Sequence, residues 1–447
     1  MGKYHAYPEY KESGVEWLGS IPADWSVRRV QETALVISGY PFESKKFDPL
    51  VGIPLIRIRD IKAQKTEVFF NGEVPKEALV DSGDVLVGMD GDFNVAMWKS
   101  GLAALNQRVA CLRADDKHLQ KFLFYVLPFN MKVVNDLTYF TTVKHLSNND
   151  ILKTVYALPE RVELINIVNF LDHETAKIDT LIEKQQQLIK LLKEKRQAVI
   201  SHAVTKGLNP EAPMKDSGVE WLGEVPEHWG VSRIKYLSSI ISKGTTPSTI
   251  GGDFVTEGVR FLKAENIGKS TSVKPFPEFF ISEKVDTQLS RSRLKENDVL
   301  VIIAGATTGL ASIVQKDVLP ANTNQAVSFI RPVNPKLSYW IVNWLTTEFV
   351  QSTIWMGAVQ AAQPNLSMED LGNIPIVVPP ESELVLIQES LKGKLATLDN
   401  LMIKAESAIS IMQERRTALI SAAVTGKIDV RNWQAPTSQN QALEQTA

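Results

Sequence analysis

The sequence predicts an α+β protein: two α/β globules with twisted, mostly β cores, separated by a long antiparallel two-helix coiled coil in a pseudo-twofold internal duplication. Three observations lead to this prediction. An apolar heptad pattern occurs twice, a short tryptophan-containing motif precedes each copy, and β-rich landmarks recur in the same order. The expected segments are a first globule at 1–160, a helix at 161–208, a second globule at 209–382, a helix at 383–428, and a Gln-, Ser- and Asn-rich disordered tail at 429–447.

The heptad pattern defines the two helices. It runs over 163–206 and again over 383–426, and the copies are offset by a constant 220 residues. Apolar residues alternate at spacings of three and four, which places them along one side of a helix as a coiled-coil seam. Each helix would measure about 66 Å at 1.5 Å per residue. The principal seam residues are Leu164, Leu171, Ile178, Ile182, Ile189, Leu192, Val199, Leu384, Leu391, Leu398, Met402, Ile409, Met412 and Leu419.

Both stretches carry helix-boundary signals. Prolines precede each copy, and acidic residues in the first turn complement the positive end of the helix dipole. Gly207 and Gly426 stand at the ends, where glycine terminates a helix by adopting a left-handed backbone.

The length of the connection predicts the direction of the second helix. About 170 residues join the two stretches, and a globule of that size is roughly 40 Å across. A parallel pair would need this segment to return along the whole rod, whereas an antiparallel pair needs only a compact domain at one end. We therefore expect antiparallel helices with a pseudo-twofold axis near Gln185 and Ala405.

The duplication extends beyond the helices. The motif SGVEWLG at 13–19 returns at 217–223, and each copy is followed by a proline and a second tryptophan. We expect Trp17, Trp25, Trp221 and Trp229 to anchor each globule by packing.

Short β-rich runs separated by turn residues follow each motif. In the first globule, 53–61 alternates apolar and charged residues, 84–94 reads as a buried strand entering a Gly/Asp turn, and 106–112 is a further strand. Matching landmarks of the second globule lie at 261–267, 298–309, 324–327 and 363–367. The frameworks correspond while the loops differ, as expected for two scaffolds that read different targets and equally for drift after duplication.

Composition bounds the class of protein. The single Cys111 excludes a disulfide scaffold and a cysteine zinc site and fits a reducing compartment. The N-terminus lacks the apolar run of a signal peptide, and no segment approaches the ~20 apolar residues that cross a bilayer, so we expect a cytoplasmic protein.

The charge balance argues against a strong stand-alone nucleic-acid binder. The net charge is −2, with 19 basic against 20 acidic residues in 1–160 and 15 against 18 in 209–382. Any DNA affinity must therefore come from local patches or from a basic partner.

Catalytic motifs are missing from the sequence. It has no phosphate-binding P-loop, no zinc-binding HExxH and no nucleophile elbow. Asp90 and Asp92 could form a metal pair, but capping of their turn is the favoured interpretation. We expect a non-catalytic chain that holds no metal and no cofactor.

Taken in order, these motifs resemble the specificity subunit of Type I restriction–modification systems over nearly the whole chain. The residues that carry the resemblance are the SGVEWLG openings, GMDGDFN at 88–94, the NQ-x-V runs at 106–109 and 324–327, KHLS at 144–147, and the helix ends RQAVISHAVTKGL and RRTALISAAVTGKI.

The resemblance implies a DNA-binding subunit that makes the sequence choice for a methyltransferase and endonuclease complex. Each globule would be a target recognition domain for one half of a bipartite, asymmetric site in double-stranded DNA. The helices would fix the spacing and dock two methyltransferase subunits, and motor/nuclease restriction subunits would join. S-adenosylmethionine and ATP would bind only to those partners, and no membrane is involved.

Base-reading chemistry favours Arg or Lys on guanine and Asn or Gln on adenine. Candidate DNA-binding residues in the first globule are Arg57, Arg59, Lys62, Asn94, Lys99, Lys144 and His145. Those in the second are Lys243, Thr245, Thr246, Lys263, Asn266, Thr307, Thr308, Gln363 and Asn365, with Arg291 and Arg293 as phosphate contacts.

Two alternatives stay open. The chain could be a non-catalytic coiled-coil scaffold whose globules bind proteins, which the lack of basic excess would suit. An enzyme with a fused catalytic function is disfavoured by the missing motifs.

Overall fold

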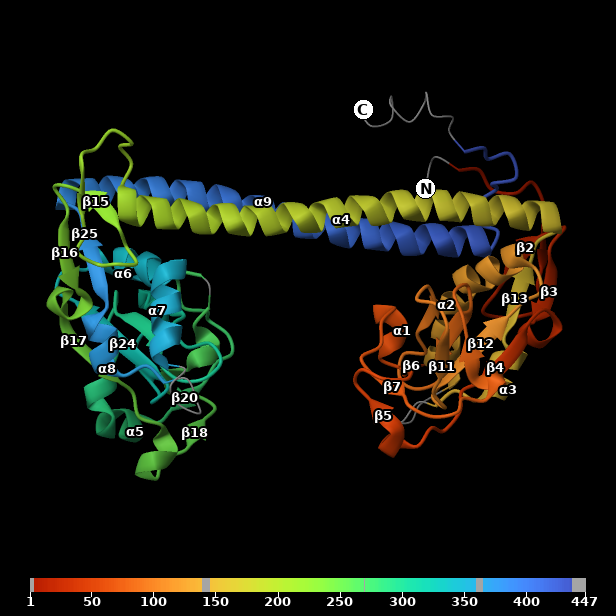
Figure 1. Ribbon diagram of the computed structural model, residues 1–447, viewed down its shortest axis with the longest axis horizontal. Helices are drawn as coiled ribbons and strands as arrows, with labels where there is room; N and C mark the ends of the chain where they lie inside the picture. The colour runs from red at the N-terminus through yellow and green to blue at the C-terminus, as the bar shows by residue number, and fades with distance from the viewer. Residues whose placement is uncertain (1–3, 139–144, 269, 359–364, 436–447) are drawn as a thin grey trace. The chain divides into compact units, whose positions relative to one another are not determined.

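The computed structural model describes residues 4–138, 145–268, 270–358 and 365–435 (Figure 1). The chain forms two compact units. The first comprises the chain up to Gln185 together with the part from Ser407, and the second comprises Gln186–Glu406. Each unit therefore combines one globule with parts of both long helices.

The first unit is built around two small sheets. A four-stranded antiparallel sheet has the order β10-β9-β12-β4, and a five-stranded sheet has the order β5-β7-β6-β11-β8. All four residues of β9 are buried, because the strand is covered on both faces. The elements are β1 Tyr10–Glu12, β2 Ser20–Pro22, β3 Ser26–Arg29, β4 Leu35–Ser38, β5 Phe47–Asp48, β6 Ile53–Ile56, α1 Asp60–Ala63, β7 Phe69–Phe70, β8 Leu79–Val80, β9 Val85–Gly88, β10 Val95–Met97, β11 Ala103–Leu105, β12 Val109–Arg113, α2 Lys117–Thr138, α3 Asn148–Lys153 and β13 Val155–Leu158.

The second unit repeats this plan. Its sheet β17-β24-β21-β22 matches β4-β12-β9-β10 strand for strand, and a second sheet has the order β18-β20-β19-β23. The elements are β14 Met214–Asp216, β15 Glu224–Pro226, β16 Gly230–Arg233, β17 Ser238–Lys243, β18 Phe254–Val255, β19 Val259–Leu262, β20 Phe280–Ile281, α5 Glu283–Gln288, β21 Val299–Ile302, β22 Ala311–Ile313, β23 Ala321–Thr323, β24 Val327–Pro332, α6 Leu337–Leu345, α7 Glu348–Ala358, α8 Met368–Asn373 and β25 Pro375–Val378. The predicted α+β duplication is confirmed.

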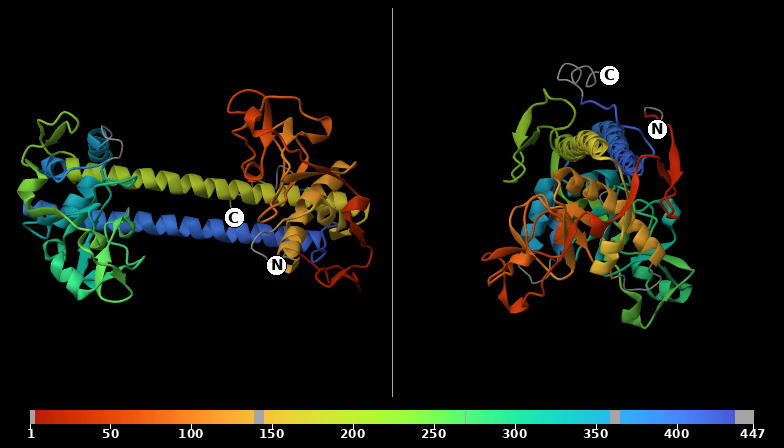
Figure 2. Two further views of the ribbon diagram at one scale, coloured as in Figure 1. Left: turned by 90° about the horizontal axis from the view of Figure 1, so that it is seen from below. Right: turned by 90° about the vertical axis from the view of Figure 1, so that its right-hand side faces the viewer.

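The two long helices are α4, Arg161–Lys206, and α9, Glu381–Val424. They run side by side and antiparallel within each unit (Figure 2). In the first unit Asp179 pairs with Arg416, and in the second Arg196 pairs with Asp399. The start of α4 therefore lies beside the end of α9, and the reverse holds in the other unit. Every predicted seam residue is buried or half-buried, because the heptad spacing turns these side chains toward the partner helix.

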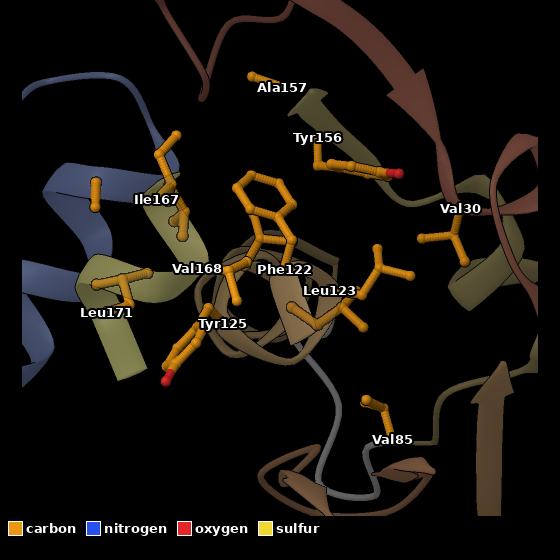
Figure 3. Packing of buried hydrophobic residues seen from close by; sticks show 14 of the residues in the cluster. Val30, Val85, Phe122, Leu123, Tyr125, Tyr156, Ala157, Ile167, Val168 and Leu171 are labelled. Carbon is orange, nitrogen blue, oxygen red and sulfur yellow. The ribbon is translucent and has the colours of Figure 1, made fainter. Parts of the chain in front are cut away.

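Each globule shares a core with the helices. In the first unit, Phe122 and Leu123 of α2 lie between Ile167 and Val168 of α4 and Tyr156 of β13 (Figure 3). The second unit likewise packs its sheet and α6 against the end of α4 and the start of α9. Within each unit, the globule and the helix segments that it contacts therefore share one continuous apolar core.

The tryptophan anchors are confirmed. Trp25 and Trp229 are almost fully buried. The Trp25 Nε1 donates to Glu163 Oε1 at 3.0 Å, and the Trp229 Nε1 donates to Glu383 Oε2 at 3.1 Å. Both glutamates lie in the first turn of a long helix, so each tryptophan ties its globule to a helix start.

The other two tryptophans are half-buried and pack on rings: Trp17 on Phe129, and Trp221 on Phe349.

The segment after α9 differs from the disordered tail expected from Asp429 onward. Val430 is buried, and the Trp433 ring packs edge-on against Phe170 at 5.6 Å between ring centroids. The Asp429 carboxylate binds the Arg431 guanidinium, which lowers the pKa of Asp429. These apolar side chains find a surface on α4 that composition alone does not reveal. Residues 436–447 lie outside the described part of the chain.

No helix in the described ranges is long and apolar enough to cross a membrane.

Candidate nucleic-acid interface

A charged triad stands at one edge of the first globule. Asp90 follows β9, and its carboxylate accepts hydrogen bonds from Arg108, at 2.8 Å to Nη1, and from His145, at 2.7 Å to Nδ1. The backbone brings the three together, because Asp90 and His145 form an isolated antiparallel β-bridge and Met89 N–H donates to Arg108 O. The carboxylate is partly buried, whereas Arg108 and His145 keep 65% and 61% of their side-chain surfaces exposed. The triad therefore exposes two hydrogen-bonding side chains, both of which are held by the Asp90 carboxylate.

This geometry corrects the interpretation of Asp90 as a turn cap, since its carboxylate bonds to two distant segments. Across the described residues, no group of three or more His, Cys, Asp or Glu side chains could hold a metal ion.

The second globule has the same backbone arrangement with different side chains. Ala304 and Asn365 form the equivalent β-bridge, and Ile303 N–H donates to Ala326 O as Met89 N–H does to Arg108 O. Two methyl groups and one amide thus occupy the places of the Asp–Arg–His triad. The edges share a framework and differ in the chemistry that they expose.

The opposite ends of the same strands carry one ion pair in both globules. Arg113 of β12 binds Asp84 in the first globule, and Arg331 of β24 binds Asp298 in the second. The acidic partners are buried, and the hydrogen bonds to Asp84 raise the pKa of Arg113. This end of each sheet is structural, because the same pair closes the same strands twice.

Three of the predicted residues of the first globule lie in segments that contact β9, the strand that precedes Asp90. Lys62 is exposed on α1 and Arg59 is exposed immediately before it, and α1 packs on β9 through Ile61 against Gly88. Asn94 is half-buried across the turn, where its carbonyl accepts from Gly88 N–H.

The other predicted residues of this globule lie elsewhere or form internal contacts. Arg57 forms a shielded ion pair with the buried Asp60 in its own turn, and its base-reading role stays a prediction. Lys99 lies away from the triad and lines a cavity of about 340 Å³ beside α4. Lys144 lies outside the described residues.

In the second globule, several predicted residues gather at the edge that matches the triad. Lys243 ends β17 and pairs with Ser328, Thr245 N–H donates to Thr323 O, and Asn365 is exposed beside the turn that holds Thr307. Thr246 follows on the same loop and is half-buried.

Two predictions for the second globule are wrong. Asn266 is fully buried, and its amide bonds to the Lys263 N–H and to the carbonyls of Lys274 and Pro277. Thr308 is also buried, and its hydroxyl donates to Gly305 O. Both side chains complete turns of the framework, because buried polar groups must find internal partners.

The remaining predicted cations have protein partners or lie elsewhere. The Lys263 ammonium sits 3.5 Å from the centroid of the Phe279 ring, and Arg293 pairs with Asp286. Arg291 is exposed in the 3-10 turn beside Arg293, which is at the structural end of the sheet. Gln363 lies outside the described part of the chain.

Sequence reasoning missed Arg108. Arg108 directly follows Asn106 and Gln107 in the NQ-x-V run, which is interpreted as a strand and not as a binding segment. The available signal was its place just before a buried strand, at the edge that also receives the polar turn after β9.

Comparison with known proteins identifies the family. The chain matches the Type I restriction modification DNA specificity domain twice, over residues 22–191 and 226–411. It is 29% identical to the Type I restriction enzyme EcoBI specificity subunit of Escherichia coli, covering 96% of this chain and 91% of that protein. The MjaVIII specificity subunit of Methanocaldococcus jannaschii is 22% identical over 95% and 98% of the two chains.

A solved chain from a study of assembly and conformational transition in the type I R-M system shares the fold. The TM-score is 0.68 at 17% identity, covering 90% of this chain and 98% of that one. The two matched domains, the relatives along the full length and the shared fold agree. The chain therefore belongs to the Type I restriction–modification specificity subunits, which are non-catalytic DNA-recognition subunits.

Proposed function

We propose that this chain recognises a bipartite, asymmetric site in double-stranded DNA, with each globule binding one half. The observation that carries the proposal is the contrast between the two sheet edges. One backbone framework exposes Asp90, Arg108 and His145 in the first globule and Ala304, Ala326 and Asn365 in the second. Side chains recognise bases through donors, acceptors and methyl groups at base edges. Different side chains on one framework would therefore select different half-sites.

The helix pair would act as the ruler between the half-sites. Each globule is fixed to both long helices by a shared core and by a tryptophan–glutamate hydrogen bond. Two readers on a stiff spacer accept only half-sites at a set separation, expected to be about one turn of DNA.

Duplicated apolar residues on the helices support docking of two copies of one partner. Leu181 and Leu401 are related by the repeat, and each is 44% exposed. Leu191 and Ile411 are also related by it, and they are 60% and 64% exposed. The first unit therefore carries Leu181 and Ile411, and the second carries Leu191 and Leu401. Large apolar side chains exposed to solvent are typical of protein interfaces. We assign these positions to two methyltransferase subunits.

The partners would supply what this chain lacks. With a net charge of −2, the specificity subunit needs additional phosphate contacts, which the methyltransferase subunits would provide. S-adenosylmethionine and ATP would bind to the methyltransferase and the motor/nuclease subunits in the cytoplasm, and this chain would hold no cofactor.

The proposal is tested by mapping methylated adenines in a genome that carries this chain with its methyltransferase. We expect one motif with two different half-sites and a fixed spacer. Binding of the purified complex to that duplex should weaken steeply with salt. Binding that is indifferent to sequence would contradict the proposal and favour the scaffold alternative. S-adenosylmethionine binding by the isolated chain would revive a catalytic role.

Docking has its own test. Leu181→Glu with Ile411→Glu should remove one methyltransferase copy. Leu191→Glu with Leu401→Glu should remove the other. Native mass spectrometry of the complex counts the copies. The matched control is Lys190→Glu with Ser410→Glu, because these exposed, repeat-related positions lie on the opposite flank of the seam. Retention of both copies in the leucine variants would contradict the assignment.

A further inference from the structure

We propose that Arg108 reads a guanine in the half-site of the first globule and that Asp90 is the residue that positions it. This inference rests on the proposed function and names the residue behind one part of the sequence choice. Arg108 Nη1 donates a hydrogen bond to Asp90 Oδ2 at 2.8 Å.

The contact with Asp90 leaves one edge of the Arg108 guanidinium available to bind a base. Guanine offers two acceptors, N7 and O6, in the major groove, and arginine binds both with two N–H groups from one side of its planar fork. Because Nη1 donates to Asp90, the edge of the guanidinium that carries Nη2 and Nε can face a base. The 65% exposure of the Arg108 side chain gives that side access to a ligand.

Asp90 would prepare the fork for binding. A flexible arginine loses side-chain freedom when it binds a base, and an internal partner that already fixes the guanidinium reduces this loss. Folding alone does not explain the pair, since an exposed ion pair contributes little stability. The second Asp90 oxygen bonds to His145, so the carboxylate is held between two side chains.

The internal duplication separates this role from a structural one. At the other end of the same strands, Arg113 and Arg331 make the same ion pair in both globules. At the triad, Arg108 is matched by Ala326. An arginine needed for the fold would be expected in both copies, whereas one that reads a base is needed only where the half-site contains guanine.

The test uses the complex of this chain with its methyltransferase subunit. Binding is measured to a set of duplexes in which each position of the bipartite site is replaced in turn. Arg108→Ala should lose the preference for guanine at one position of one half-site by roughly five- to 150-fold, as for a bidentate arginine–guanine contact. The other half-site and the spacer should be unchanged.

Asp90→Asn tests positioning. It keeps the size of the side chain and removes its charge, so it should weaken discrimination at the same position, and the double variant should be no worse than Arg108→Ala. Arg108→Lys should restore only part of the preference, because an ammonium is not a planar fork. Arg28→Ala is the matched control, since Arg28 also forms a surface ion pair, with Glu32 on the neighbouring turn.

The outcomes separate this inference from the proposed function. If wild-type binding is sequence-specific and Arg108→Ala keeps every base preference, the inference fails and the proposed function stands. An equal loss of affinity for all duplexes would make Arg108 a phosphate contact and also overturns the inference. A wild-type complex without sequence preference would instead refute the proposed function. Circular dichroism of each variant excludes loss of fold as the cause.

Discussion

Asp179 of α4 forms an ion pair with Arg416 of α9, with 2.8 Å between Asp179 Oδ1 and Arg416 Nε. In the second unit the same relationship joins Asp399 to Arg196 at 3.0 Å. Asp399 lies 220 residues after Asp179. Arg416 lies the same distance after Arg196, so the duplication relates the two ion pairs. They are one contact made twice, and they mark the antiparallel register of the helices in each unit.

We expect these ion pairs to contribute little stability. Asp179 is half-exposed, so a double-mutant cycle of Asp179→Ala and Arg416→Ala should give a coupling of about 0.2–1 kcal/mol. Leu171→Ala, at a fully buried seam position, should cost about 2–5 kcal/mol because it opens a cavity. Urea unfolding of the purified chain measures both. A coupling as large as the Leu171 effect would contradict this ranking.

The tryptophan–glutamate anchor should matter more in the first unit. Glu163 is buried and accepts from both Trp25 and the Tyr7 hydroxyl. Glu163→Ala leaves these buried donors without a partner, at about 1–3 kcal/mol for each unsatisfied group.

Glu383→Ala is the matched control. The Glu383 carboxylate is partly exposed and bonds to Trp229 and His228, so water can replace it and the loss should be smaller. Chemical unfolding of the two variants gives the comparison. Equal losses would mean that burial does not set the strength of the anchor.

The ruler predicts how the spacer changes with helix length. Inserting one heptad after Gln185 and one after Ala405 keeps the seam in register and adds about 10 Å to both helices. Adenine mapping should then give a spacer longer by up to about three base pairs.

Each half-site should keep its sequence, because neither globule is altered. An insertion in α4 alone breaks the register and should lengthen the spacer or abolish activity. A change in the half-site sequences themselves would refute the division of roles.

Buried tyrosines predict loss of stability at alkaline pH. Burial raises the pKa of Tyr156 to about 12, and it also raises the pKa of Tyr7 and of Tyr125 above the ordinary 10. Below pH 10 both the folded and the unfolded chain hold these protons, so the buried tyrosines make their full contribution to stability. Above pH 10 the unfolded chain releases them first. The free energy of unfolding then falls by up to about 1.4 kcal/mol per pH unit for each tyrosine.

Urea unfolding between pH 8 and 12 measures this slope. Tyr156→Phe should reduce the slope between pH 10 and 12. The exposed Tyr236→Phe is the control and should leave it unchanged. An identical slope in the Tyr156 variant would contradict the assignment.

The candidate interface could be predicted only in part. Lys243, Thr307 and Asn365 lie at the end of a recognisable strand or in turns next to one, at one edge, and their role in DNA binding stays a prediction. Asn266 and Thr308 stand in equally polar turns, yet their side chains face inward and bond to the backbone. Composition does not distinguish these cases, because the direction of a turn side chain depends on the segments packed around it.

The sequence by itself determined the duplicated helices, their seam, the matching strands and the family. These features depend on spacings within one segment or on the constant offset between copies, both of which are local and can be counted. The tertiary structure decided which polar side chains meet. Asp90 lies 18 residues from Arg108 and 55 from His145, and their hydrogen bonds arise only when the strands pair. Contacts across such distances form by packing of the whole globule, which no local pattern specifies.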